Sequence, residues 1–471
     1  HIKNSGENDF IITASNTGGN ANGIRFGGNN SSIVVDGPVT IDGVKAGKRS
    51  ANGVGMNFGP ASATFNGPLT ITNVEAAGDS TGVQTYGIYA NATGAKVVVT
   101  GPLNISNVKG SAVGAARQGA EVFTAGGRIT AVADPDKRYF AVRAANGTIN
   151  MNVEGAANHI APSSLVITGD IEVGGQGVAN INLPDAKSSW TGIVSNRNKM
   201  NLTLQNGATW TTKRHSFVVD DMNELKVTSL KGGEDKDTAG IIRPEDSRTV
   251  VIGDYSGNAV IYYPHTAEAT STMIGADVKI AKAAPGSHVV LRTGNEGLDT
   301  ESENPQSNQA VTAALKALAN KFWYTGFVNE AEKDNLTGTV EIAEGLTSRS
   351  ALRSGRLGFI AGTGQGDYNS RREIKNKFSS TIYGIEEKDQ EYVDSGVRQA
   401  DGTYKFTDDA VISTKDANVT ADKISYNRAV AGIVGNGNDV TVTSGDKTLR
   451  LQQLAGERDY QALGVYANKK V

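Results

Sequence analysis

The chain has 471 residues, of which 57 are glycine and 11 are proline, and it contains no cysteine. Charged residues make up 20% of it and the formal net charge is −3, without a long run of one sign, which argues against nucleic acid as a partner. The lack of cysteine rules out thiolate metal sites and suits export through an oxidising compartment. No stretch approaches the roughly 18 apolar residues of a membrane helix and no leader opens the chain, so we expect it to be soluble.

An internal repeat dominates the N-terminal part of the chain. Three segments of equal length align without gaps, at 23–44, 53–74 and 87–108. Apolar residues alternate with polar ones in each segment, as strands require. The aligned apolar positions form three columns: Val35, Phe65 and Val99; Val39, Leu69 and Leu103; Ile41, Ile71 and Ile105.

Units of this size cannot bury their apolar side alone, so neighbouring units must stack column on column, about 4.8 Å apart. The pattern predicts a right-handed parallel β-helix with about 22 residues per turn. An antiparallel sandwich is the alternative, but it would not place like residues in register at fixed offsets. A Gly-Pro pair separates the two strands of each segment (37–38, 67–68 and 101–102). We expect a corner there, with glycine at positive φ.

The segments between the repeats, 45–52 and 75–86, differ in length while the repeats do not. Insertions should therefore emerge from one edge of the β-helix, where repeat proteins usually carry contacts. Tyr86 and Tyr89 are the only nearby aromatic platforms on which a sugar could stack. The candidate binding residues at this edge are Lys45, Lys48, Arg49, Glu75, Asp79, Tyr86 and Tyr89.

Strand and turn texture continues beyond residue 109, and the segment 190–233 carries a recognisable pattern. Its W-x-G, its N-L-T-L-x-N-G-A-x-W and the hydrophobic strand pair that follows resemble the passenger domains of type V autotransporters. The matching residues are Trp190, Gly192, Asn201, Leu202, Leu204, Asn206, Gly207, Ala208, Trp210, Leu225, Val227 and Leu230. The segments 289–294 and 336–351 are similar to strands of the same kind of passenger.

The resemblance implies a Gram-negative surface protein whose passenger crosses the outer membrane through its own C-terminal β-barrel. That barrel is not in this sequence, and residues 462–471 restart the repeat pattern and stop within a unit. We therefore expect the natural protein to continue, with this part displayed at the cell surface and anchored at the outer membrane.

One segment breaks the strand pattern. Val311, Leu315, Leu318 and Phe322 recur at helical spacing, which predicts an amphipathic helix over 308–323 with a structural role. The expected organisation is a β-helix over 1–306, a helical insertion over 307–326 and a continuing β-helix over 327–471. A charge-rich stretch at 386–409 is expected to be a loop excursion and a separate binding candidate.

Polysaccharide lyases and hydrolases also occur on parallel β-helices, and they need clustered acids with a histidine or a basic partner on one face. Asp220 and Asp221 are the best acidic pair, but neither Gly-His-Gly nor Arg-x-Lys occurs, and the five histidines stand alone. The sequence at 253–257 has a tyrosine inserted into a Gly-Asp-Ser-Gly pattern, which indicates a turn between strands. The glycine-rich 362–367 lacks a phosphate-loop lysine. We expect no catalysis, cofactor or metal.

The sequence favours an adhesin passenger that binds a host or bacterial surface protein or glycan, or pairs with an identical rod on another cell. Many weak polar contacts along one edge could add through multivalency. Two alternatives stay open: a polysaccharide-acting enzyme on the same fold, and a structural spacer.

Overall fold

The computed structural model describes residues 2–3 and 10–342, with gaps at 49, 80, 82–83, 154–159, 197, 217–222, 265–273, 295–297, 299–312 and 316. Beyond residue 342 it describes only the strands from β32 to β42. The chain divides into two units, the first made of residues 1–260 and 276–284 and the second of residues 261–275 and 285–471. No helix in the described ranges is long and apolar enough to cross a membrane.

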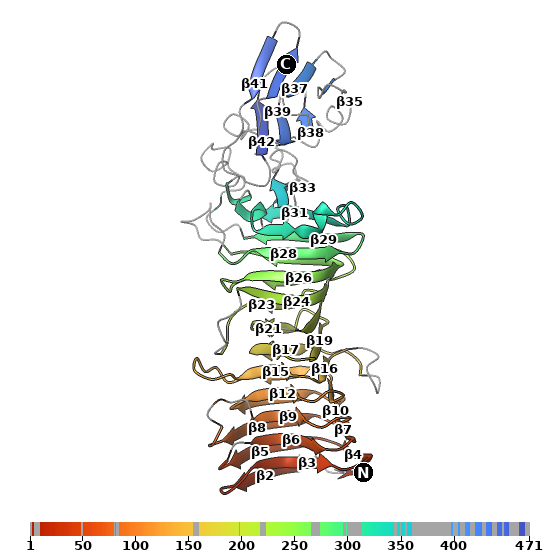
Figure 1. Ribbon diagram of the computed structural model, residues 1–471, viewed down its shortest axis with the longest axis vertical. Coiled ribbons are helices and arrows are strands. Elements are labelled where there is room, and N and C mark those ends of the chain that lie inside the picture. The colour runs from red at the N-terminus through yellow and green to blue at the C-terminus, as the bar shows by residue number, and fades with distance from the viewer. Residues whose placement is uncertain are drawn as a thin grey trace. The chain divides into compact units, whose positions relative to one another are not determined.

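The first unit is a parallel β-helix, as the repeat predicted. Its strands stack coil upon coil from the N-terminus (Figure 1), and the described strands within it pair in parallel, as between β4 and β7 or β5 and β8. We name its three sheets A, B and C.

Each of the first coils passes through sheet C, then sheet A, then sheet B. Sheet C consists of β3 (Ala21–Gly27), β6 (Ala51–Phe58), β9 (Tyr86–Ala90), β12 (Ser111–Ala115), β15 (Phe140–Ala144), β18 (Asp170–Val173) and β21 (Val194–Asn196). Sheet A consists of β1 (Ile2–Lys3), β4 (Ser31–Asp36), β7 (Ala61–Phe65), β10 (Lys96–Val99), β13 (Glu121–Thr124), β16 (Thr148–Met151), β19 (Val178–Leu183), β22 (Lys199–Leu204), β24 (Glu224–Lys231), β26 (Thr249–Ser256) and β28 (Val278–Ala283). Sheet B consists of β2 (Phe10–Asn16), β5 (Val39–Ala46), β8 (Leu69–Ala76), β11 (Leu103–Val108), β14 (Gly127–Thr130), β17 (Leu165–Thr168), β20 (Ser189–Thr191), β23 (Thr209–Thr211), β25 (Gly240–Arg243) and β27 (Asn258–Tyr262).

The predicted columns are the core of this unit. Ile71 pairs with Ile41 on one side and Ile105 on the other, and Phe65 pairs in the same way with Val35 and Val99. The isoleucine column extends over eight coils through side chains that are all fully buried: Ile41, Ile71, Ile105, Ile129, Ile167, Trp190, Trp210 and Ile242. The β-helix therefore continues past residue 109, where the repeat fades in the sequence.

The predicted coil length, which equated one repeat with one full turn, is wrong. In the first coils Ser31 pairs with Ala61, and Ser62 pairs with Lys96, so a coil is longer than the aligned segment. The repeat is only the constant part of a coil, and the segments between the repeats complete each turn. Coil length also varies along the unit, since Ser189 pairs with Thr209 whereas Gly127 pairs with Leu165.

The Gly-Pro corners are present, and the expected positive φ is found at the first glycine but not at the other two. Gly37 has a φ of +96°, whereas Gly67 and Gly101 do not adopt positive φ. A Cβ on Gly67 would lie 2.2 Å from the Gly37 carbonyl oxygen, and one on Gly101 would lie 2.4 Å from the Gly67 carbonyl. Close stacking of the corner backbones excludes any side chain at these two positions.

Coils of the first unit change from three strands to two after β21 and β22. Strand β24 lies beside both β21 of sheet C and β22 of sheet A, and from there each coil has one strand in sheet A and one in sheet B. Strands β24 and β26 are correspondingly long, at 8 residues each.

The second unit begins as a parallel pair, β29 (Ser287–Thr293) and β31 (Leu336–Ile342), with Ser287 facing Leu336. The segments 313–315 and 317–319 are helical and bury Leu315 and Leu318, as predicted for the amphipathic helix. Its predicted end is wrong, because Phe322 and Trp323 belong to β30 (Phe322–Tyr324), which a 3-10 turn, Thr325–Val328, follows.

The predicted continuing β-helix over 327–471 is not what the later strands form. Strands β32 (Leu346–Ser348), β33 (Ser350–Arg353) and β34 (Arg356–Phe359) all pair antiparallel. Two further antiparallel sheets contain β35 (Val397–Arg398), β36 (Tyr404–Lys405), β37 (Ala410–Thr414), β40 (Val440–Ser444) and β41 (Lys447–Leu451), and β38 (Thr420–Ser425), β39 (Val430–Gly435) and β42 (Gln461–Tyr466). The charge-rich 386–409 thus includes β35 and β36; its remaining residues, like 362–367, lie outside the described residues.

Candidate binding edge

Several long loops of the first unit leave sheet B at the side where it passes to sheet C. The longer loops that join these two sheets are 47–50, 77–85 and 131–139, and a fourth loop, 212–223, leads from β23 of sheet B to β24 of sheet A, whereas the turns from sheet C to sheet A are short. We call these four loops the loop edge. The two predicted insertions lie at this edge, but the expectation that insertions emerge from one edge alone is wrong, because the long connection 152–164 joins sheet A to sheet B. Both predicted insertions are also shorter than expected, because Lys45 lies in β5, Asn52 in β6, and Glu75 in β8.

Backbone hydrogen bonds stack the first two loops on each other. Gly47 N donates to the Asn16 carbonyl (2.8 Å), Ala77 N to the Ala46 carbonyl (2.9 Å) and Gly78 N to the Lys48 carbonyl (3.3 Å). The starts of the first two loops are therefore layers of the β-helix.

A charged ladder borders the loop edge on the outer face of sheet B. Lys45 pairs in register with Glu75, and the Glu75 carboxylate accepts a 2.7 Å hydrogen bond from Lys109 Nζ and lies 3.8 Å from Lys45 Nζ. The Lys109 hydrogen bond is the main reason that the pKa of Glu75 is lowered from its ordinary value of 4.5. Two cations therefore flank one anion, and the ladder carries a net positive charge.

A second ladder on the same face is polar and uncharged over most of its length. Asn73 Nδ2 donates to Asp42 Oδ1 (2.7 Å), and Asn107 Nδ2 donates to Asn73 Oδ1. Asn73 and Asn107 adopt positive φ (57° and 49°), as does Gly43 (74°) one coil earlier, since asparagine is among the few residues that tolerate this conformation. The local bend turns these amides outward, where they are exposed.

Asp79 is a structural residue of the loop 77–85. Its carboxylate is mostly buried and accepts hydrogen bonds from Thr81 Oγ1 (3.2 Å), Gln84 N (2.9 Å) and Thr85 Oγ1 (2.8 Å). These bonds fix the loop. A ligand would have to compete with them, so Asp79 does not fit its predicted role as a binding residue.

Tyr86 is not the exposed platform that the sequence suggested. Only 2% of its surface is accessible, and its ring stacks on the half-buried Tyr89 with centroids 3.9 Å apart. The Tyr86 ring occupies the space above Gly114, where a Cβ would lie 2.4 Å from it. Because burial raises the pKa of the Tyr86 phenol, this group stays neutral at physiological pH. The pair is part of the scaffold, with only the Tyr89 ring partly accessible.

An ion-pair cluster that sequence reasoning missed adjoins the two tyrosines. Arg143 Nη1 donates to Tyr86 Oη (2.8 Å), and Glu172 accepts from both Arg143 and Arg138. The residues come from β15, β18 and the loop 131–139, which are far apart in sequence but stacked in the β-helix. Because the coils differ in length, no regular spacing in the sequence marks this column of side chains.

A buried carboxylate ties the last loop of the edge to the scaffold. Asp170 accepts hydrogen bonds from the backbone nitrogens of Ile193 (2.9 Å), His215 (3.1 Å) and Ser216 (2.9 Å). Ser216 Oγ in turn donates to the Lys137 carbonyl (2.7 Å), which joins the third loop to the fourth. No pattern in the sequence indicated this role for Asp170.

Among the remaining predictions, Lys48 is exposed in the loop 47–50, and Arg49, Asp220 and Asp221 lie outside the described residues. Residues 253–256 are part of β26, so the predicted turn there is wrong except at Gly257, whose φ is +79°. Tyr255 is buried in this strand. In the described ranges, no group of three or more His, Asp or Glu side chains could hold a metal ion.

Comparison with known proteins finds no family model, curated protein or solved structure that matches the chain. The structure therefore defines its class by architecture, as a parallel β-helix protein whose coils carry a loop edge and outward polar ladders.

Proposed function

We propose that this chain is part of the exported passenger of a bacterial autotransporter and acts as an adhesin at the cell surface. The loop edge and the two ladders beside it would form the contact surface. The observation that carries the proposal is that core packing and surface contact use different side chains. A continuous buried column fixes the coils, while exposed charged and amide groups repeat at one side of them.

Repetition matters because each exposed polar contact is weak. A single surface ion pair contributes roughly 0–1 kcal/mol. Groups that recur in register with the coils can engage a repeating partner many times, and such contacts multiply when they are held on one scaffold. A repeating glycan, a fibrous surface protein or a second copy of this chain would offer that kind of partner.

Display of the chain on bacteria that do not aggregate provides the test. The variant Lys45→Glu with Lys48→Glu reverses the net charge of the ladder and removes the net charge of loop 47–50, which keeps Arg49. Arg117→Glu, in an exposed turn between sheets C and A, is the control. We expect the double variant to reduce settling of the suspension or attachment to host cells by about threefold or more, and the control to change neither.

Mixing labelled cells that display the chain with cells that do not separates self-association from binding to another partner. If a well-folded double variant settles and attaches as the unmodified chain does, the loop edge is not the contact surface. If no displayed form attaches or aggregates, the adhesin proposal fails.

A further inference from the structure

Three neighbouring strands of sheet A break their alternation at the same place. Buried residues of a strand normally alternate with outward ones. In β24, however, Thr228 and Ser229 both separate buried Val227 from buried Leu230. Strands β26 and β28 repeat this irregularity, with two consecutive outward residues at 253–254 and at 281–282. The irregular positions are aligned across all three strands.

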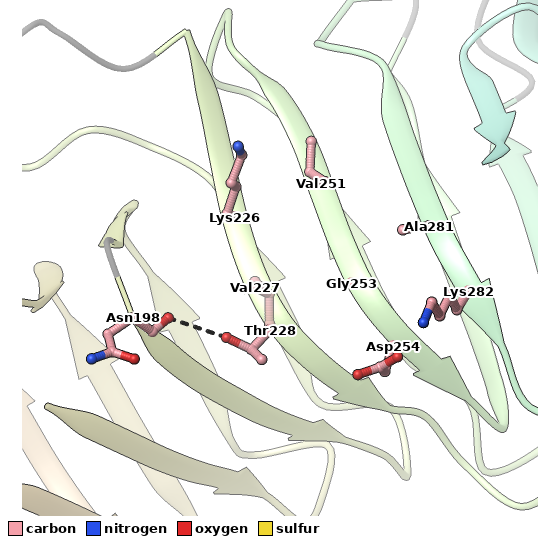
Figure 2. Close-up of a pocket in the computed structure, with 9 residues that line it drawn as sticks. All are labelled: Asn198, Lys226, Val227, Thr228, Val251, Gly253, Asp254, Ala281 and Lys282. Atoms are coloured by element: carbon pink, nitrogen blue, oxygen red, sulfur yellow. Dashed lines mark hydrogen bonds between the residues drawn. The ribbon is translucent and has the colours of Figure 1, made fainter. Parts of the chain in front are cut away.

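A hollow of about 570 Å³ opens on the outer face at this irregularity. Figure 2 shows the three strands side by side with the lining residues on them, apart from Asn198, which lies in the turn between β21 and β22. The hollow lies beside the turn that joins β21 to β22, where the chain passes from sheet C to sheet A. The loop edge, in contrast, lies where the chain leaves sheet B. Its volume falls within the range of about 300–1,000 Å³ that is usual for small-molecule sites. Its lining comprises Asn198, Lys226, Val227, Thr228, Val251, Gly253, Asp254, Ala281 and Lys282.

Small and aliphatic groups form the floor. A Cβ on Gly253 would lie 2.5 Å from the Thr228 carbonyl oxygen, so no side chain can occupy that position without moving the backbone. Ala281 adds only a methyl group, and Val251 is half-buried. The Thr228 hydroxyl is engaged by the scaffold, since it donates to the Asn198 carbonyl (3.2 Å) and accepts from Met200 N (3.0 Å). The floor is therefore fixed in place and mostly apolar.

Charged groups stand at the two ends of the lining. Asp254 and Lys282 are exposed partners in register on β26 and β28, yet no ion pair joins them in the described part of the chain. Lys226 stands at the opposite end from this pair (Figure 2), with its Nζ 3.2 Å from Glu224. The lining thus offers a carboxylate acceptor and two ammonium donors above an aliphatic floor.

The geometry points to a site for an acidic sugar residue, such as the uronate of a glycan. A pyranose ring presents its C–H groups to the aliphatic floor, its hydroxyls can donate to Asp254, and its carboxylate can accept from Lys282. A simple inorganic anion fits less well because it has no hydroxyl to donate and Asp254 would repel it. A neutral sugar offers no anionic group to the Lys282 ammonium.

The test is binding of a galacturonate oligosaccharide to the full chain, measured by calorimetry or by ligand-observed NMR at low salt. A neutral galactose oligosaccharide of the same length, sulfate and a poly-glutamate peptide serve as comparators. We expect binding of the uronate to exceed that of each comparator by about fivefold or more, since a hydrogen bond to a charged group is stronger than a neutral one even where solvent screens part of the gain.

The matched variants are Lys282→Ala in the lining and Lys279→Ala, which removes the same side chain from the same strand outside the hollow. Lys282→Ala and Asp254→Asn should each weaken uronate binding about five- to tenfold, and Lys279→Ala less than twofold. An unchanged thermal midpoint for each variant confirms that the fold is kept.

Equal binding of uronate and neutral sugar, full displacement by sulfate, or equal binding of the acidic peptide would each overturn the proposal. If Lys282→Ala and Lys279→Ala weaken uronate binding equally, the binding depends on the overall positive charge of the strand and not on the hollow, and the proposal is overturned as well. None of these outcomes bears on the loop edge, because the hollow and the loops share no residue.

Discussion

The indole rings of Trp190 and Trp210 stack in parallel across neighbouring coils, with centroids 4.9 Å apart and planes 3° apart. Both side chains are fully buried and in register on β20 and β23. Trp190 Nε1 donates to the Gly169 carbonyl (3.0 Å) and Trp210 Nε1 to the Gly192 carbonyl (3.2 Å). The tryptophans that most suggested a known family therefore serve as core packing.

Trp210→Ala should be among the most destabilising substitutions in the first unit. It removes a stacked, hydrogen-bonded indole and leaves a cavity beside Trp190, at an expected cost of about 3–5 kcal/mol. Chemical denaturation followed by circular dichroism measures the change. Trp323→Phe, in the half-exposed position of β30, is the control and should shift the midpoint far less. Similar midpoints for the two variants would contradict the packing role.

Ile71→Asp should unfold the coils around it, whereas Lys45→Ala should be nearly neutral. Ile71 is fully buried between Ile41 and Ile105, and an unpaired carboxylate there would cost about 4 kcal/mol or more. Lys45 is largely exposed, and its ion pair with Glu75 is long, at 3.8 Å. Thermal melting of both variants gives the comparison. Equal melting temperatures would mean that the strand register is shifted by one residue, which would exchange the two faces.

The apolar columns could be predicted because they depend on short-range alternation, which a repeat displays directly. Ile71 and Phe65 were placed correctly for this reason. Coil length was not predictable in the same way, because the loops that complete each coil vary without changing the columns. The side chains on the outer face depend on those coil lengths, so the contact between Tyr86 and Arg143, which lie in different coils, has no signal in the sequence.

Predictions that rested on a single residue type were the weakest. A tyrosine beside a loop suggested a platform, yet Gly114 in the next coil leaves space for the Tyr86 ring to lie flat on the sheet. An aspartate in an inserted loop suggested a ligand contact, yet the carboxylate of this residue, Asp79, already accepts hydrogen bonds from two threonine hydroxyls and a backbone nitrogen. Burial at both positions depends on groups from other parts of the chain or loop, which composition does not reveal.

The titration of Glu75 tests the charged ladder directly. Its pKa should lie below 4.5 in the native chain, chiefly because of the hydrogen bond from Lys109. A lowered carboxyl pKa stabilises the fold at pH values above the unfolded pKa, and this contribution is lost as the pH falls through the native pKa. NMR of chain labelled at glutamate should show the pKa return toward 4.5 in Lys109→Ala. Lys45→Ala, which removes the weaker partner, should shift it less. An equal shift in both variants would contradict the ladder geometry.

The hollow on β24, β26 and β28 should bind without turning over its ligand. Glycoside hydrolysis generally uses two carboxyl groups placed on either side of the scissile bond, and among the described residues that line the hollow only Asp254 carries a carboxylate. Incubation of the full chain with polygalacturonate should therefore release no reducing ends and form no unsaturated product, with or without added calcium. The control is a chain variant, Asp254→Asn, measured beside the unmodified chain. Turnover by the unmodified chain that disappears in Asp254→Asn would show an enzyme at the hollow, whereas turnover that persists in it would direct attention to Asp220 and Asp221.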